Sequence, residues 1–142
     1  MISDWGPGLW RFYHTMSVNI KKKYFNEIKD EYLNLCIKMC HSLPCPMCRR
    51  HATDYMSKIN KSEIKTRKDL ILLFYNFHNH VSQSKNREIY KDETLSIYKK
   101  LKTEQIINES SNILKRYFNN ELFKEFTEWF DKNKDKFKSR NK

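Results

Sequence analysis

Apolar side chains recur three and four residues apart along most of this 142-residue chain. Between residues 26 and 40, for example, the spacing is followed by Ile28, Tyr32, Leu35 and Met39. This period places them on one face of a helix, whereas a half-buried strand would alternate every second residue. With two glycines and three prolines, the chain also has few of the residues that β-rich folds use in turns. The pattern predicts an all-α protein.

Four helices are expected before residue 85. The first follows a cap at Asp4, and the second spans about 26–40. The prolines at 44 and 46 precede a third helix that reaches about residue 58. The fourth begins at Thr66, whose spacing from Asp69 is that of a capping box. Two or three further helical stretches are expected after residue 92.

Length and charge limit the classes of protein that this chain can belong to. A chain of 142 residues buries one core, so a second full domain is not expected. The net charge of +11 would attract anionic partners, but the basic residues are spread along the chain. We interpret them as solvated helix surface rather than as a nucleic-acid site. No apolar run approaches the roughly 20 residues of a membrane-spanning helix, and no cleaved export signal is recognisable at the N-terminus, so a soluble protein is expected.

All four cysteines fall within 13 positions, which indicates a local chemical site rather than bridges that hold a fold together. Cys45 and Cys48 form a Cys-x-x-Cys motif where the third helix is expected to begin. Such a pair can close a disulfide with little backbone movement, and the helix dipole stabilises a thiolate there. Arg49 and Arg50 should lower the thiol pKa further. The motif therefore predicts thiol–disulfide exchange.

The main alternative is a zinc site. The available ligands are Cys36, Cys40, His41, Cys45, Cys48 and His51. Structural zinc sites usually join two short ligand pairs across a longer connection, and here one pair would have to come from the middle of a helix. We therefore expect no metal, and a zinc-stabilised basic module that binds nucleic acid remains the alternative function. The strand pattern of a thioredoxin fold is missing before the motif.

Three short motifs follow one another along the chain: Trp10-x-x-x-His14, Cys45-x-x-Cys48 and His78-Asn79-His80-Val81-Ser82. Together they resemble the Erv/ALR family of flavin-linked sulfhydryl oxidases, in which these motifs lie on the first, third and fourth helices. The resemblance covers about residues 5–100. It implies a four-helix bundle that holds FAD at its mouth, a short fifth helix and a homodimer. It also implies an oxidase domain, residues 1–100, followed by a charged helical C-terminal extension, residues 101–142.

The resemblance assigns FAD contacts to particular residues of this chain. Arg87 stands where the family usually has a lysine near the phosphates, and Lys85 is a neighbouring cation. Tyr90 stands where phenylalanine is usual, Ser82 replaces the usual asparagine, and Tyr98 is an approximate counterpart of the next aromatic residue. The complete set of expected FAD contacts is Gly6, Trp10, His14, Cys48, His78, Asn79, Val81, Ser82, Lys85, Arg87 and Tyr90.

By analogy with the family, Cys45 and Cys48 are the catalytic pair. A partner's thiolate attacks Cys45 and releases Cys48 toward the flavin, from which electrons pass to oxygen. The net reaction joins two thiols into a disulfide and reduces oxygen to hydrogen peroxide. Because no cysteine lies before Cys36 or after Cys48, we expect a thiol of a partner protein, thioredoxin-like or from a virion, to reach Cys45 directly. Cys36 and Cys40 are interpreted as small buried hydrophobes rather than as an internal relay.

The chain also looks like the oxidases that large cytoplasmic DNA viruses carry. This likeness predicts a location in the host cytoplasm, at a viral factory, or in the virion, and a mitochondrial intermembrane relative is the alternative. The apolar residues between Leu122 and Phe130 leave a third function open, a docking element for another protein or a second copy. That function is compatible with the oxidase.

Overall fold

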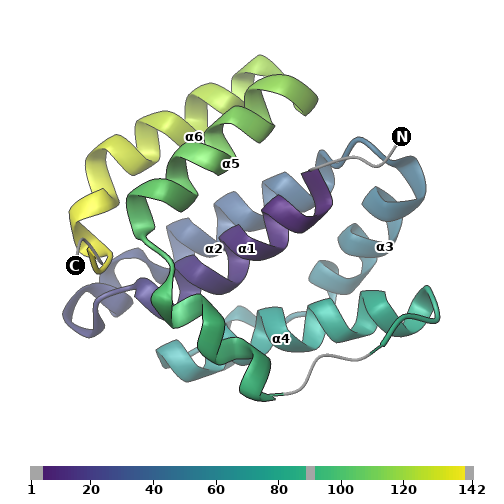
Figure 1. The fold of residues 1–142 in the computed structure, drawn as a ribbon, viewed down its shortest axis with the longest axis horizontal. Coiled ribbons are helices and arrows are strands. Elements are labelled where there is room, and N and C mark those ends of the chain that lie inside the picture. The colour runs from purple at the N-terminus through teal and green to yellow at the C-terminus, as the bar shows by residue number, and fades with distance from the viewer. Residues whose placement is uncertain (1–4, 89–91, 140–142) are drawn as a thin grey trace.

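Six α-helices make up most of the computed structural model, which describes residues 5–88 and 92–139. In chain order they are α1 (Trp5–Asn19), α2 (Phe25–His41), α3 (Pro46–Ser57), α4 (Arg67–Ser84), α5 (Thr103–Tyr117) and α6 (Asn120–Asn133). α1 and α2 occupy the middle of Figure 1, with α3 and α4 on one side of them and α5 and α6 on the other. No strand occurs among the described residues, whose β-type pairing is an isolated bridge between Ile20 and Phe137. The predicted all-α class is confirmed.

Local sequence signals determine where two of these helices begin. Cys45 is the N-cap of α3, because its sulfur accepts a hydrogen bond from the Cys48 amide (3.2 Å), and Pro46 occupies the first turn. At α4, the Thr66 hydroxyl accepts from the Asp69 amide (3.1 Å), and the Asp69 carboxylate accepts from the Thr66 amide (3.0 Å). The predicted capping box is therefore present, and the Cys-x-x-Cys motif opens a helix as predicted.

The segment where the short fifth helix was expected is a 3-10 helix, η3 (Asp92–Lys100). It lies against α1, where the Tyr98 ring is 4.7 Å from the His14 ring between centroids. A 3-10 helix rises about 2.0 Å per residue, more than an α-helix does. This geometry suits a short segment that must connect α4 to α5 while packing on α1.

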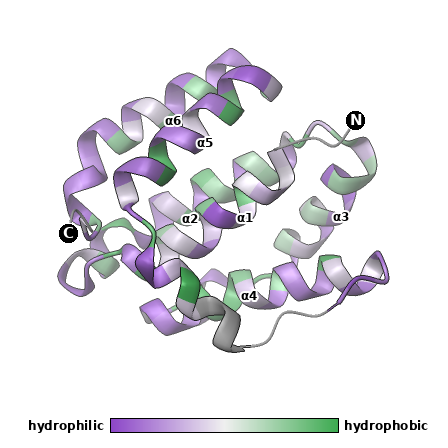
Figure 2. Ribbon diagram, viewed as in Figure 1, coloured by the Kyte–Doolittle hydropathy of each residue, from purple (hydrophilic) through white to green (hydrophobic). Residues whose placement is uncertain are grey.

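The C-terminal helices share one hydrophobic core with the first four. Phe126 and Phe130 are buried, and their rings lie 5.4 and 5.8 Å from the Phe12 ring on α1. α5 packs so closely against α1 at Gly8 that a side chain added there would collide with Ile113 of α5. Much of α5 and α6 is coloured as hydrophilic in Figure 2, whereas α1 is mostly neutral or hydrophobic.

This packing bears on two expectations from the sequence. Leu122, Phe126 and Phe130 are buried in the core, so these side chains are not free to form the docking element suggested for this segment. The domain boundary at residue 100 stays a prediction from the sequence, and residues on both sides of it contribute to the shared core. Exposed large hydrophobic side chains of the described surface are Met47, Leu72 and Ile97. None of the described helices combines the length and the apolarity needed to cross a bilayer.

Candidate functional site

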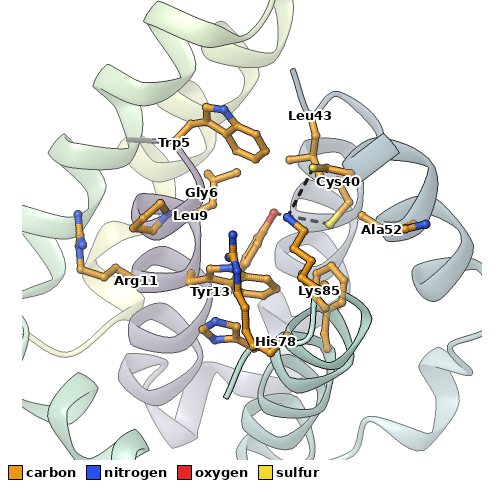
Figure 3. A pocket seen from close by; sticks show the side chains of 18 of the residues that line it. Trp5, Gly6, Leu9, Arg11, Tyr13, Cys40, Leu43, Ala52, His78 and Lys85 are labelled. Atoms are coloured by element: carbon orange, nitrogen blue, oxygen red, sulfur yellow. Dashed lines mark hydrogen bonds between the residues drawn. The ribbon is translucent and has the colours of Figure 1, made fainter. Parts of the chain in front are cut away.

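A pocket of about 1000 Å³ lies between α1, the end of α2, α3, α4 and η3 (Figure 3). This volume is at the upper end of the range of about 300–1,000 Å³ that is typical of small-molecule sites. Several residues that the sequence assigned to FAD line it: Gly6, Trp10, Cys48, His78, Val81, Ser82, Lys85 and Arg87. The fold thus brings residues of all three motifs to one cavity.

Two of the expected contacts, His14 and Asn79, do not line the pocket. His14 is buried behind the pocket wall, where its Nε2 lies 2.9 Å from Nδ1 of His78. Asn79 is half-buried on α4 and does not line the pocket. Tyr90 lies outside the described residues. His14 thus contacts the pocket-lining ring of His78 instead of the pocket itself.

Where α1 meets α4, the pocket wall is aromatic. The Trp10 ring stacks on the His78 ring with centroids 4.0 Å apart and planes 6° apart, and Phe77 meets Trp10 edge-on at 5.0 Å. Burial, assisted by His78, lowers the pKa of His14 to about 3. Burial, assisted by the charge of Arg87, lowers the pKa of His78 to about 4. Both imidazoles are therefore neutral near pH 7, and a flat ring system could stack on this wall without meeting a charge.

The two motif cysteines occupy different environments. Cys48 lines the pocket and Cys45 does not, and both carry free thiols. A hydrogen bond from the Cys48 thiol holds the pKa of Cys45 below its usual value, whereas burial and the interaction with Cys45 raise the pKa of Cys48. Because the two pKa values shift in opposite directions, Cys45, the sulfur outside the pocket, gives up its proton more readily than Cys48 does.

The cation that acts on both thiols is Lys85. Its Nζ lies 3.9 Å from Sγ of Cys48, and its charge lowers both thiol pKa values. In Figure 3 the Lys85 side chain extends from α4 toward the wall that contains Cys40 and Ala52. The sequence suggested that Arg49 would lower the thiol pKa values, but its guanidinium instead donates a hydrogen bond to the Leu43 carbonyl (2.8 Å). The charge beside the motif thus comes from α4, not from the residue that follows the motif.

Further cations and an ion pair border the pocket. Lys85 and Arg87 are exposed on its α4 side, next to Glu88. On the α1 side, Arg11 forms an ion pair with Glu109 of α5. This pair links the pocket rim to the C-terminal helices. Lys85 and Arg87, which follow the last residue of α4, could contact phosphate groups.

Some residues that line the pocket were missed by sequence reasoning. Trp5, Leu9 and Tyr13 share a face of α1 at four-residue spacing, a signal that the sequence does contain. Cys40 reaches the pocket from the end of α2, and its Sγ lies 3.6 Å from the Tyr13 hydroxyl. Burial raises the pKa of Cys40 to about 12. Cys40 is therefore a neutral thiol, which agrees with its interpretation as a small hydrophobe. Leu101 reaches the pocket only through tertiary packing, and no sequence signal identifies it.

A zinc site lacks its ligands in the described part of the chain. Within residues 5–88 and 92–139, no three His, Cys, Asp or Glu side chains converge closely enough to hold a metal ion. Cys36 and Cys40 are buried on α2, whereas Cys45 and Cys48 are half-exposed at the start of α3. The alternative of a zinc-stabilised module has no support from this geometry.

Comparison with known proteins agrees with the site. The model of the Erv1/Alr family matches residues 7–106. An FAD-linked sulfhydryl oxidase of African swine fever virus (isolate Tick/Malawi) is 31% identical over 104 residues, which cover 73% of this chain and 84% of the relative. Its counterpart from another isolate (Pig/Kenya) is 33% identical over 91 residues, covering 60% and 71%. No solved structure matches. Since the family model covers well over half of the sequence, the chain belongs to the Erv1/Alr family.

Proposed function

We propose that this chain is an FAD-linked sulfhydryl oxidase that forms disulfides in partner proteins and reduces oxygen to hydrogen peroxide. One observation carries the proposal. The Cys48 sulfur lines a large aromatic pocket, while Cys45, three residues earlier, lies outside it at the N-terminus of α3. A disulfide between them would connect a surface that a protein thiol can reach with a cavity that can hold an electron acceptor. The names of the African swine fever virus relatives support the same activity.

The pocket fits FAD in size and in chemistry. The stacked Trp10 and His78 rings offer a flat neutral surface for a ring system, and Lys85 and Arg87 offer positive charge for the phosphates. Buried His14 Nδ1 has no hydrogen-bond partner within the described chain, but His14 lies behind His78 and does not line the pocket, so the flat ring surface offered to FAD comes from Trp10 and His78. When bound, FAD would supply a two-electron acceptor that oxygen can reoxidise.

The remaining chemistry belongs to the cysteines. A substrate thiolate attacks Sγ of Cys45 in the Cys45–Cys48 disulfide, forming a mixed disulfide and releasing Cys48 as a thiolate. A second substrate thiolate attacks the mixed disulfide at the substrate's own sulfur, which yields the substrate disulfide and frees Cys45. The electron pair gained by the chain then leaves from Cys48, the sulfur in the pocket. The Cys45–Cys48 disulfide re-forms when a two-electron acceptor in the pocket takes that pair, and any proton that either thiolate has picked up from water is released in the same step.

The electrostatics of the site assist the release of Cys48. Burial and the interaction with Cys45 raise the Cys48 pKa, and Lys85 lowers it. In the mixed disulfide Cys45 carries no charge and has no free thiolate, so its share of that increase disappears while the Lys85 contribution remains. Cys48 is therefore a better leaving group during turnover than its pKa in the free dithiol indicates.

The test is direct. Protein purified in the presence of FAD should be yellow and should consume oxygen when supplied with dithiothreitol. Cys48→Ser should abolish oxygen consumption while FAD remains bound, because the pocket keeps its other walls. Cys36→Ala, which removes a fully buried cysteine outside the motif, is the matched control and should retain activity. Failure to retain any FAD, or full activity of Cys48→Ser, would contradict the proposal.

We also propose, from the resemblance, that the enzyme is a homodimer and acts in the host cytoplasm, at a viral factory, or in the virion. The viral relatives support a viral setting. Sedimentation of the purified protein would test the dimer. Microscopy of the tagged protein in infected cells would distinguish a cytoplasmic factory from a mitochondrial location.

A further inference from the structure

α3 separates two cavities. The pocket described above meets the face that carries Cys48, His51 and Ala52. A second, open groove lies on another face of α3 and at the end of α2; we call it the α3 groove. Its walls are His41, Pro46, Arg49, Arg50, Thr53, Asp54 and Ser57. Because successive residues of an α-helix are rotated by about 100°, these two residue sets point to opposite sides of α3.

Cys45, the N-cap of α3, lies at the end of the helix from which both faces begin. It directly precedes Pro46 of the groove, and its carbonyl accepts a hydrogen bond from the Arg49 amide (2.8 Å). In thiol–disulfide exchange the attacking sulfur approaches in line with the bond that breaks. Since Cys48 lines the pocket, a thiolate that attacks Cys45 must come from the side away from that pocket. The α3 groove lies on the face of α3 opposite the pocket, and its wall begins at Pro46, the residue after Cys45.

The α3 groove is predominantly basic. Arg49 and Arg50 contribute two guanidinium groups, and His41 adds an imidazole. The Arg49 guanidinium is held by the Leu43 carbonyl, while Arg50 is exposed. The acidic residue of the groove, Asp54, forms an ion pair with Lys58 (3.1 Å), which offsets its charge. A polypeptide segment with carboxylates would complement this surface.

We propose that the α3 groove receives the substrate polypeptide beside its reacting cysteine and selects substrates whose neighbouring residues are acidic. This inference rests on the proposed function, because it takes Cys45 as the sulfur that substrate attacks. Because exposed charge pairs are individually weak, the groove changes the relative rates at which different substrates react. A preference of roughly threefold to tenfold at low salt is expected from a few such pairs.

The experiment isolates the Cys45 step from FAD. In a Cys48→Ser variant, the Cys45 thiolate attacks a peptide whose cysteine is activated as a mixed disulfide with thionitrobenzoate. The products are a Cys45–peptide disulfide and free thionitrobenzoate, which is followed by absorbance. Two peptides are compared that differ only in flanking residues, glutamates in one and lysines in the other. A variant lacking both Cys45 and Cys48 measures the background from the buried Cys36 and Cys40.

The measured quantity is the ratio of the two rates, acidic over basic peptide. It should be roughly three to ten at low salt and approach one as salt screens the charges. Arg50→Glu, added to the Cys48→Ser background, should bring the low-salt ratio to one or below. Lys124→Glu, an exposed charge reversal on α6, makes the same change in net charge and should preserve the ratio. In Figure 1, α6 and α3 lie on opposite sides of α1 and α2.

Three results would overturn the proposal: a ratio of one or less in the Cys48→Ser protein, an Arg50→Glu variant that keeps the preference, or a Lys124→Glu variant that loses it equally. The last result would assign the preference to the net charge of +11 instead of to the groove. Because the measurement needs no flavin, loss of FAD binding or of dithiothreitol oxidation would refute the proposed function without changing this outcome.

Discussion

Replacing Lys85 with glutamine is expected to raise the pKa of the Cys48 thiol. The Lys85 ammonium lies 3.9 Å from Sγ of Cys48, and it is the cation whose charge lowers the pKa of this thiol. At that distance two unit charges attract by about 1 kcal/mol in water and about 4 kcal/mol at an effective dielectric constant near 20. Lys85 is solvent-exposed, so the lower figure applies. It corresponds to roughly 0.5–1 pKa unit.

The assay measures Cys48 alone. In a Cys45→Ser background, which keeps a good N-cap for α3, Cys48 is the remaining accessible thiol. The rate of its alkylation by iodoacetamide is recorded against pH, and the midpoint reports the pKa. Lys85→Gln should move the midpoint upward by roughly 0.5–1 unit. Lys85→Arg, the matched control that keeps the charge, should leave it nearly unchanged.

Salt provides a second readout, because added salt should narrow the difference between the protein that retains Lys85 and the Lys85→Gln variant. A midpoint that stays the same or falls in Lys85→Gln would refute the reasoning. In that case the thiolate would be stabilised by the helix N-terminus rather than by the α4 cation.

Three further predictions concern stability. Phe126→Ala should lower the free energy of unfolding, measured with urea, by about 3–5 kcal/mol, because the side chain is fully buried in the shared core. A loss below about 1 kcal/mol would mean that the C-terminal helices fold separately. Gly8→Ala should destabilise by about 1 kcal/mol despite a better helix propensity, because the new methyl group meets the Ile113 terminal methyl, and Ile113→Val should relieve this cost in the double variant. Lowering the pH from about 6.5 toward 4 should lower the free energy of unfolding, because His14 and His78 bind protons in the unfolded chain but not in the folded chain. This prediction is contradicted if the urea midpoint stays constant over this pH range, or if His14→Asn leaves the dependence of the midpoint on pH unaltered.

The local sequence was sufficient to predict that the Cys-x-x-Cys motif lies at the start of a helix, and also where α4 begins. Proline within the first turn, a capping sulfur at Cys45 and the Thr66–Asp69 pair each act within a few residues. Such signals are readable in a single sequence because the atoms that interact are neighbours in the chain. For the same reason the periodicity of apolar residues was sufficient for the all-α class.

The gathering of the three motifs around one pocket was inferred from a family resemblance, since nothing local connects Trp10 to His78. Their stacking depends on how α1 crosses α4. Tertiary packing also explains why the cation near Cys48 is Lys85 and not Arg49, as the sequence had suggested. Lys85 lies 37 positions from Cys48 in the chain. Long side chains from distant helices are placed by packing, and packing has no signature in the order of residues.

The sequence by itself determined the helical class, the helix start that holds Cys45 and Cys48, and the residue types available for chemistry. Tertiary structure alone decided that Cys48 lines the pocket while Cys45 lies outside it, and that α5 and α6 complete the core. The physical reason is range. Backbone periodicity and capping act over one helical turn, whereas burial, charge proximity and thiol pKa depend on side chains that only the folded chain brings together.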